Sequence, residues 1–239
     1  MNENNESSIN KINQDTPNLT AEQYKALSKW LSLLFWLCIP SVVGYILSNV
    51  YVDLLNSFVY LLGNAAIIAV SLLYGFFMFK LSEVRKDYKK SAILDIASLL
   101  IYNSIFILSE DFTSVIIFLT ISAVLGAAAY YYEIKAHSSA LIGIDDTLST
   151  KWKKFWKWYI IFTVATIAVV IIAVVVLVIV FSSVVYNGGS TGGILFGLIV
   201  LLLLAIALLI ASVVISVLRL LYLYRTARIF KNLYEGHNM

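Results

Sequence analysis

All seventeen Lys and Arg residues of this chain fall on one side of a membrane when its apolar stretches are threaded through a bilayer in order. A helix needs ~20 mostly apolar residues to cross the hydrocarbon core. Hydrophobic residues make up 61% of the 239 and charged residues 13%, far from the usage of soluble domains. We therefore predict an all-α integral membrane protein, a bundle of six transmembrane helices. The predicted spans are Leu31–Leu47, Ser57–Phe79, Ala92–Leu108, Phe112–Tyr132, Tyr159–Tyr186 and Ile194–Leu218.

The positions of the charges predict the orientation. Short cytoplasmic loops carry an excess of Lys and Arg. Here the cations lie in the N-terminal segment, in the second-to-third and fourth-to-fifth connections, and at the C-terminal end, whereas the opposite connections carry Asp53, Glu110 and Asp111. Both termini are therefore predicted to be cytoplasmic. A five-span alternative, without the third span, would place the cations of Arg85–Lys90 opposite those of Lys151–Lys157, so six spans are favoured.

Composition divides the chain into three parts. Residues 1–29 are predicted to form a polar, disordered cytoplasmic tail that ends in a short helix start, residues 30–224 a transmembrane domain, and residues 225–239 a short cytoplasmic tail. Thr20 and Gln23 have the spacing of a capping box at a helix start. Pro40 is expected to kink the first span, and Asp146 or Ser149 is a candidate cap for the fifth helix.

Polar side chains within the spans are candidates for lining a cavity or for packing between helices. Asn64 and Asn103 are expected at a similar depth, where an amide pair between helices is the favoured interpretation. Asp95 is the acid within a span; a functional role is the default for such a residue, but a carboxylate near a helix N-terminus is also stabilised there. The spacing of three and four residues places Asp95, Ser98 and Tyr102 on one helical face. The complete set is Asn64, Asp95, Ser98, Tyr102, Asn103 and Thr120.

A basic and aromatic stretch precedes the fifth span and is predicted to be a helix at the lipid interface. At 100° per residue its aromatic rings share one face and its lysines the other. The stretch either anchors the chain to anionic lipid headgroups or merely orients the helix, and the second interpretation is favoured. Its residues are Lys151, Trp152, Lys153, Lys154, Phe155, Trp156, Lys157 and Tyr159.

Catalysis is not indicated by the sequence. The chain has neither H-E-x-x-H nor G-x-S-x-G, and it has two histidines in all. We predict no catalytic residues, no metal site and no cofactor, with an intramembrane or lipid-modifying enzyme as a disfavoured alternative. The best remaining set of metal-ligand types is Glu133, His137, Asp145 and Asp146, which ordinary solvated charges explain equally well.

Two classes of function remain. The first is a transport-related subunit or small permease of the bacterial cell membrane, suggested by six spans and by the polar side chains of the second to fourth. Because the chain has no ATP-binding motif, such a role needs either a protein partner such as an ATPase subunit or a facilitative mechanism. The alternative is a non-transporting scaffold, regulatory or protective (immunity-like) protein. Nucleic acid is not an expected partner in either case.

Overall fold

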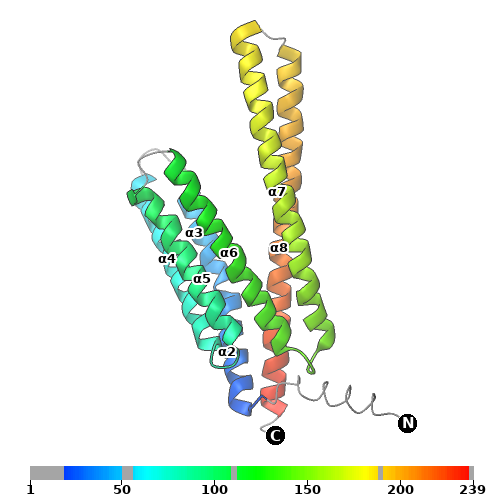
Figure 1. The fold of residues 1–239 in the computed structure, drawn as a ribbon. Helices are drawn as coiled ribbons and strands as arrows, with labels where there is room; N and C mark the ends of the chain where they lie inside the picture. Colours follow the sequence, from blue (N-terminus) through cyan, green and yellow to red (C-terminus); the bar gives the residue numbers. More distant parts are fainter. Residues whose placement is uncertain (1–18, 50–55, 109–111, 188–190, 237–239) are drawn as a thin grey trace, which may run out of the picture. The chain divides into compact units, whose positions relative to one another are not determined.

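The computed structural model describes residues 19–49, 56–108, 112–187 and 191–236, and this part of the chain is helical apart from short turns (Figure 1). Most of the predicted tail, residues 1–18, lies outside the described residues. The helices are α2 (Ala21–Trp36), α3 (Cys38–Asn49), α4 (Asn56–Leu81), α5 (Lys86–Leu108), α6 (Phe112–Ala140), α7 (Asp146–Asn187) and α8 (Thr191–Gly236). The expected all-α class is thus confirmed.

Within the described residues, five helical stretches are long and apolar enough to cross a membrane. They are Ala21–Ser48, Phe58–Leu81, Thr113–Ala140, Asp146–Ile179 and Ile199–Gly236. Helix α5 is not among the five, and four of its first five residues are charged. The chain is therefore a membrane protein with several apolar helices.

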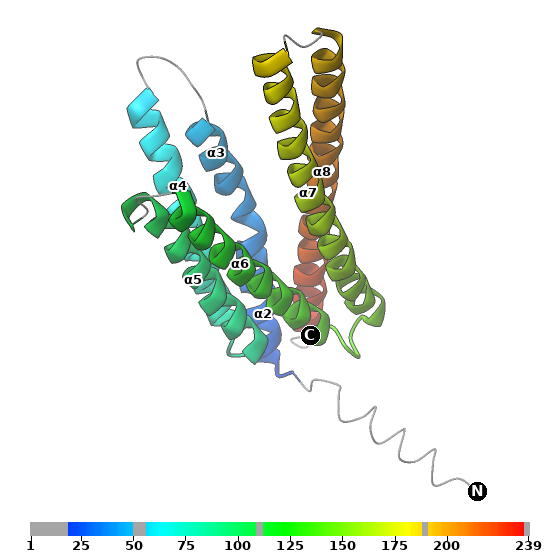
Figure 2. The same ribbon diagram turned by 45° about the horizontal axis from the view of Figure 1, so that its top comes forward.

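The helices form two compact units, residues 1–153 with 222–239 and residues 154–221. In the second unit α7 and α8 run side by side as a hairpin (Figures 1 and 2). The most hydrophobic windows of these two helices contain no buried residue. A surface of this kind is compatible with lipid and not with water.

Local sequence explains where the first helices begin and end. The capping box at the start of α2 is present: Thr20 Oγ1 accepts from the Gln23 amide at 3.3 Å, and Gln23 Oε1 accepts from the Thr20 amide at 3.0 Å. The predicted kink is also present as a break at Leu37 between α2 and α3. Pro40 has no amide hydrogen to donate to the carbonyl of Trp36, and its ring crowds that carbonyl, so a regular helix is interrupted there.

Helices α3 and α4 approach each other closely at two glycines. A Cβ atom built on Gly63 would lie 2.4 Å from the Ser48 amide nitrogen, and one on Gly44 would lie 3.2 Å from the Ala66 Cβ. Only a residue without a side chain fits at Gly63, because the atoms that it meets are backbone atoms that cannot turn aside. Small residues that let backbones meet are the usual basis of helix contact in membranes.

Helices α5 and α6 run antiparallel and are joined along their length. Near one end Arg85 Nη2 donates to the Ser139 carbonyl at 3.1 Å. About halfway along, Ser98 Oγ donates to the Ser122 carbonyl at 2.8 Å and Ser122 Oγ donates to the Ser98 carbonyl at 3.0 Å. Each hydroxyl thus satisfies a carbonyl of the other helix, which fixes the register of the pair.

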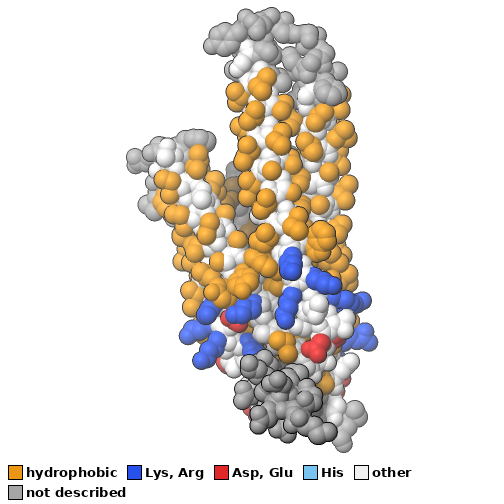
Figure 3. All heavy atoms as spheres, turned by 45° about the vertical axis from the view of Figure 1, so that its right-hand side comes forward, with side chains coloured by type: hydrophobic (Ala, Val, Ile, Leu, Met, Phe, Trp, Pro, Cys, Tyr) orange, Lys and Arg blue, Asp and Glu red, His pale blue; other side chains and the backbone are white. Residues whose placement is uncertain are grey.

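The buried core of the first unit lies at the end that holds the α4–α5 and α6–α7 turns. The start of α2 meets the end of α8 there, since the rings of Tyr24 and Phe230 stack at 6.2 Å between centroids. Figure 3 shows Lys and Arg gathered at this end, while hydrophobic side chains cover the rest of the visible helices. Helix α8 continues as far as Gly236 through the residues predicted as a tail at 225–239, and it buries Thr226, Ala227 and Phe230 there.

Candidate functional site

A cluster of buried polar side chains occupies the basic end of the first unit. His137 of α6 is 0% exposed, and its Nδ1 lies 2.9 Å from the hydroxyl of Tyr88, which is also 0% exposed. On the other side of the ring, Glu133 Oε1 lies 3.5 Å from His137 Nε2. An imidazole is thus placed between a phenol and a carboxylate, away from water.

Trp152 closes this cluster on the side of α7. Its ring stacks on that of His137, with 4.7 Å between centroids and 28° between planes. Its Nε1 donates to Thr226 Oγ1 at 3.1 Å, and that hydroxyl donates to the Tyr222 carbonyl at 2.7 Å. A buried tryptophan usually finds such a partner for its N–H group. The cluster therefore joins α5, α6, α7 and α8.

The environment keeps the Tyr88 phenol protonated. Burial raises the pKa of Tyr88 above its ordinary value of 10.0, and the negative charge of Glu133 raises it further, whereas Arg85 opposes the shift. Burial acts in this direction because it penalises the charged phenolate. Tyr88 can consequently donate its proton in a hydrogen bond to His137.

The metal-ligand types noted in the sequence are not brought together. Glu133 and His137 are buried in α6, whereas Asp145 Oδ1 accepts from the Leu148 amide at 2.8 Å and Asp146 Oδ1 accepts from the Gly143 amide at 2.8 Å. No group of three His, Cys, Asp or Glu side chains in the described part of the chain could hold a metal ion. Glu133 and His137 thus pack in the core, whereas Asp145 and Asp146 accept hydrogen bonds in the turn before α7.

The expected helix cap is corrected by the same contacts. Asp145, and neither Asp146 nor Ser149, caps α7, because its carboxylate accepts from the amide three residues on. Ser149 is buried and instead exchanges hydrogen bonds with Ser138 of α6, at 2.8 Å and 3.2 Å to the two carbonyls. Gly143, with φ of 74°, supplies the left-handed residue in the turn.

A second polar site lies farther along the helices of the first unit. Asp95, Ser98 and Tyr102 of α5 line one open pocket of about 180 Å³, as their spacing predicts. Ser71 of α4 and Ser122 of α6 complete its polar lining. The suggestion that Asp95 sits at a helix N-terminus is wrong, because α5 begins at Lys86, more than two turns earlier. The helix dipole therefore does not account for this carboxylate, since its effect is confined to the first turn.

The remaining polar candidates bond to their own helices. Asn64 Nδ2 donates to the Tyr60 carbonyl at 2.9 Å, and Asn103 Nδ2 donates to the Leu99 carbonyl at 2.8 Å. Thr120 is exposed, and its hydroxyl donates within α6. The expected amide pair between Asn64 and Asn103 is not formed in this structure.

The basic and aromatic stretch is the first part of α7, and two of its aromatic rings do not face lipid. Trp152 and Phe155 are 0% and 3% exposed, so their assignment to a lipid interface is corrected by their burial in protein. Trp156 and Tyr159 are half-buried and stack on each other at 5.8 Å between centroids. Lys153, Lys154 and Lys157 are exposed, and Lys151 is half-buried.

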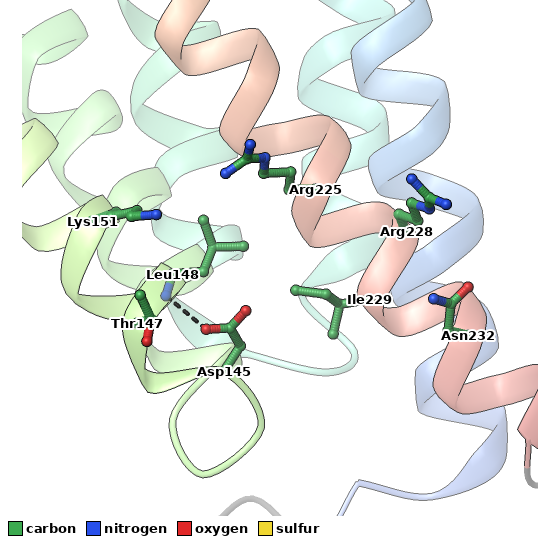
Figure 4. A pocket seen from close by; sticks show the side chains of 8 residues that line it. All are labelled: Asp145, Thr147, Leu148, Lys151, Arg225, Arg228, Ile229 and Asn232. Carbon is green, nitrogen blue, oxygen red and sulfur yellow. Dashed lines mark hydrogen bonds between the residues drawn. The ribbon is translucent and has the colours of Figure 1, made fainter.

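Lys151 belongs to a third site, an open pocket of about 180 Å³ at the basic end of the first unit (Figure 4). The first turns of α7 form one wall, and the last turns of α8 form the other. The residues that line it are Asp145, Thr147, Leu148, Lys151, Arg225, Arg228, Ile229 and Asn232.

Comparisons with family models, with curated proteins and with solved structures return no match to this chain.

Sequence reasoning missed two features of the basic end. The first is the core around His137, although the one-turn spacing of Glu133 and His137 drew attention to it. The second is the pairing of Lys151 with Arg225 and Arg228 in one pocket, for which the three-residue spacing of the arginines was the available signal. Both join segments that are far apart in the sequence.

Proposed function

We propose that this protein is a transport-related membrane protein, a small permease or the membrane subunit of a larger transporter, and that the pocket beside Asp95 contacts its substrate. The observation that carries the proposal is the lining of that pocket by a carboxylate and by the hydroxyls of Ser98, Tyr102 and Ser122. An ionisable side chain at membrane depth is costly and is commonly retained for a substrate or ion pathway.

The proposal includes six crossings, with α5 as the third. Helix α5 has 23 residues, which at ~1.5 Å per residue gives ~35 Å, enough for a hydrocarbon core of ~30 Å. The reciprocal hydrogen bonds of Ser98 and Ser122 hold α5 beside the apolar helix α6. Either both helices therefore cross the membrane or neither does. The charges at the start of α5 then lie in the headgroup region.

The contacts at the basic end support an even number of crossings. The stacking of Tyr24 on Phe230 joins the start of α2 to the end of α8. The hydrogen bond from Arg85 to Ser139 joins the α4–α5 turn to the end of α6. Since Lys and Arg favour the cytoplasmic side, this end, with both termini, is assigned to the cytoplasm of a bacterial cell.

Extraction of the tagged protein from its native membrane in a mild detergent tests the function. Mass spectrometry then identifies what stays bound at stoichiometric amounts. An ATPase or permease partner is the result expected for a transporter subunit, because the chain has no ATP-binding motif to drive transport itself.

A protein that is recovered alone is next reconstituted in liposomes, and the fluxes of H⁺, Na⁺ and K⁺ are compared with those of D95N. The conservative amide keeps the size of the side chain but removes its charge. A wild-type flux that D95N abolishes supports a permease. Recovery alone together with no flux favours a non-transporting scaffold, regulatory or protective protein.

A further inference from the structure

The pocket at the basic end of the first unit combines three cations with a single acid. Lys151 projects from α7, and Arg225 and Arg228 project from α8 (Figure 4). Asp145 is the acid among the lining residues, and one of its oxygens is already engaged by the Leu148 amide at 2.8 Å. The lining thus carries a net charge of +2.

The cations of this pocket are not neutralised within the described part of the chain. No ion pair or hydrogen bond joins Lys151, Arg225 or Arg228 to another described residue, whereas Lys80, Lys135 and Lys231 each lie within 4.0 Å of a carboxylate. Figure 4 shows Lys151 and Arg225 extending toward each other from facing helices. Arg225 and Arg228 are exposed and Lys151 is half-buried, so all three cations are accessible to an anion.

We propose that this pocket binds a phosphate group, with Arg225 and Lys151, which extend toward each other, as its principal donors and Arg228 as a third. The planar guanidinium fork matches the oxygens of phosphate, and an ammonium adds a point charge. Asn232, which also lines the pocket, supplies a neutral amide donor. The ligand class is therefore a phosphate monoester or diester, whose oxygens suit the guanidinium, ammonium and amide donors of the lining.

The position of the pocket favours the phosphate of a phospholipid. Arg225 follows the apolar stretch that ends at Leu218 by seven residues, or ~10 Å along a helix, which corresponds to the headgroup layer. A Lys or Arg near an anionic leaflet contributes about 1 kcal/mol, which is roughly fivefold in binding. A soluble phosphate compound would present the same oxygens, and the experiment separates the two sources.

Native mass spectrometry of the full-length protein in detergent tests the proposal. Phosphatidylglycerol, phosphatidylcholine and inorganic phosphate are added in separate titrations to the wild type and to R225Q/R228Q. The matched control is K153Q/K157Q, which removes the same charge from exposed positions of α7 outside the pocket. R225K/R228K restores the charge, and K151Q provides a second test should R225Q/R228Q not fold.

The expected result is that phosphatidylglycerol binds the wild type about tenfold or more tightly than R225Q/R228Q, with K153Q/K157Q like the wild type. R225K/R228K should fall between the two, because lysine restores the charge but not the planar fork. Inorganic phosphate that binds the wild type and is lost in R225Q/R228Q would support the site with a soluble source. Equal phosphatidylglycerol binding in all variants, or an equal loss in the control, would overturn the proposal. Because the protein is in detergent, this outcome does not depend on the proposed transport function or on the proposed membrane topology.

Discussion

At the scale of single residues, the basic end is held by hydrogen bonds between buried polar groups, while His137 Nε2 makes no hydrogen bond within the described part of the chain and lies 3.5 Å from Glu133 Oε1. His137, Tyr88 and Trp152 are each 0% exposed, and their hydrogen bonds end on other buried groups. A buried donor or acceptor that loses its partner costs about 1–3 kcal/mol, whereas removal of both partners together is nearly neutral. The cluster should therefore respond to paired and single substitutions in different ways.

The bond between Tyr88 and His137 is tested by a double-mutant cycle of Y88F and H137F. Y88F removes the hydroxyl at His137 Nδ1, and H137F removes the imidazole beside both the Tyr88 hydroxyl and Glu133. Each single variant is expected to lose about 1–3 kcal/mol of unfolding free energy. The double variant should lose no more than H137F, because both variants remove the imidazole beside Glu133 and only H137F also leaves the Tyr88 hydroxyl facing an apolar ring. Thermal unfolding in detergent measures the three losses. Additive losses would show that the two groups are not coupled.

The raised pKa of Tyr88 predicts a loss of stability at alkaline pH. The folded state holds the phenol proton above the ordinary pKa of 10.0, where the unfolded chain releases it. The contribution of this group is therefore fully present below about pH 10 and is lost as the pH rises above that value, by about 1.4 kcal/mol per unit.

Thermal midpoints of the wild type and Y88F at about pH 8 and about pH 11 measure this effect, because the other tyrosines are common to both proteins. The fall in midpoint should be smaller for Y88F. An equal fall in the two proteins would mean that Tyr88 ionises as readily in the folded state as in the unfolded chain.

At the scale of helices, contacts between neighbours depend on small residues. Gly63 admits the backbone of α3 at Ser48, and the paired hydroxyls of Ser98 and Ser122 hold α5 to α6. Helices in lipid gain little from burying apolar surface against one another, so close approach and interhelical hydrogen bonds carry more of the association.

The substitution G63A tests the contact between α3 and α4. The added methyl group would lie 2.4 Å from a backbone nitrogen, so the helices must separate, and we expect a loss of about 1–3 kcal/mol. G236A is the matched control, because a Cβ atom there meets nothing within 4 Å. Thermal unfolding of the two variants gives the comparison. A midpoint for G63A equal to that of G236A would contradict the close approach.

The sequence predicted those parts of the fold that depend on neighbouring residues. Hydrophobic length indicated the helices, Thr20 and Gln23 their first cap, and Pro40 the break at Leu37. Sequence-based prediction failed for contacts between residues that are distant in the sequence. The spacing of Trp152 and its neighbouring aromatic residues is the same whether lipid or His137 covers the ring of Trp152. Depth alone also could not show that Asn64 and Asn103 would bond to their own helices, since a local carbonyl competes with a distant amide.

At the scale of the whole molecule, the number of crossings is the property that decides the orientation of every loop. Glu83, in the α4–α5 turn, has a side chain that is 71% exposed. Glu110 lies in the connection between α5 and α6, outside the described residues. These two positions lie on opposite sides of the membrane if α5 crosses it and on the same side if it does not.

Cysteine labelling of E83C and E110C in intact cells tests the six-span proposal. Cys38, the single native cysteine, is first replaced by alanine to remove its thiol. An impermeant maleimide should label E110C and spare E83C, and both should label once the cells are permeabilised. Equal labelling of the two in intact cells would exclude α5 as a span, and labelling of E83C alone would invert the orientation.

The stacking of Tyr24 on Phe230 also has a consequence for the order in which the molecule is completed. A chain is synthesised from its N-terminus, and its early segments wait for partners that are made later. Here the ring that covers the first helix lies near the far end of the sequence, and the hydroxyl that accepts from Trp152 belongs to the same late segment. Ribosome arrest before Tyr222 would therefore remove the contact of Phe230 with Tyr24 and that of Thr226 with Trp152. Such an incomplete chain would be a substrate for membrane quality control.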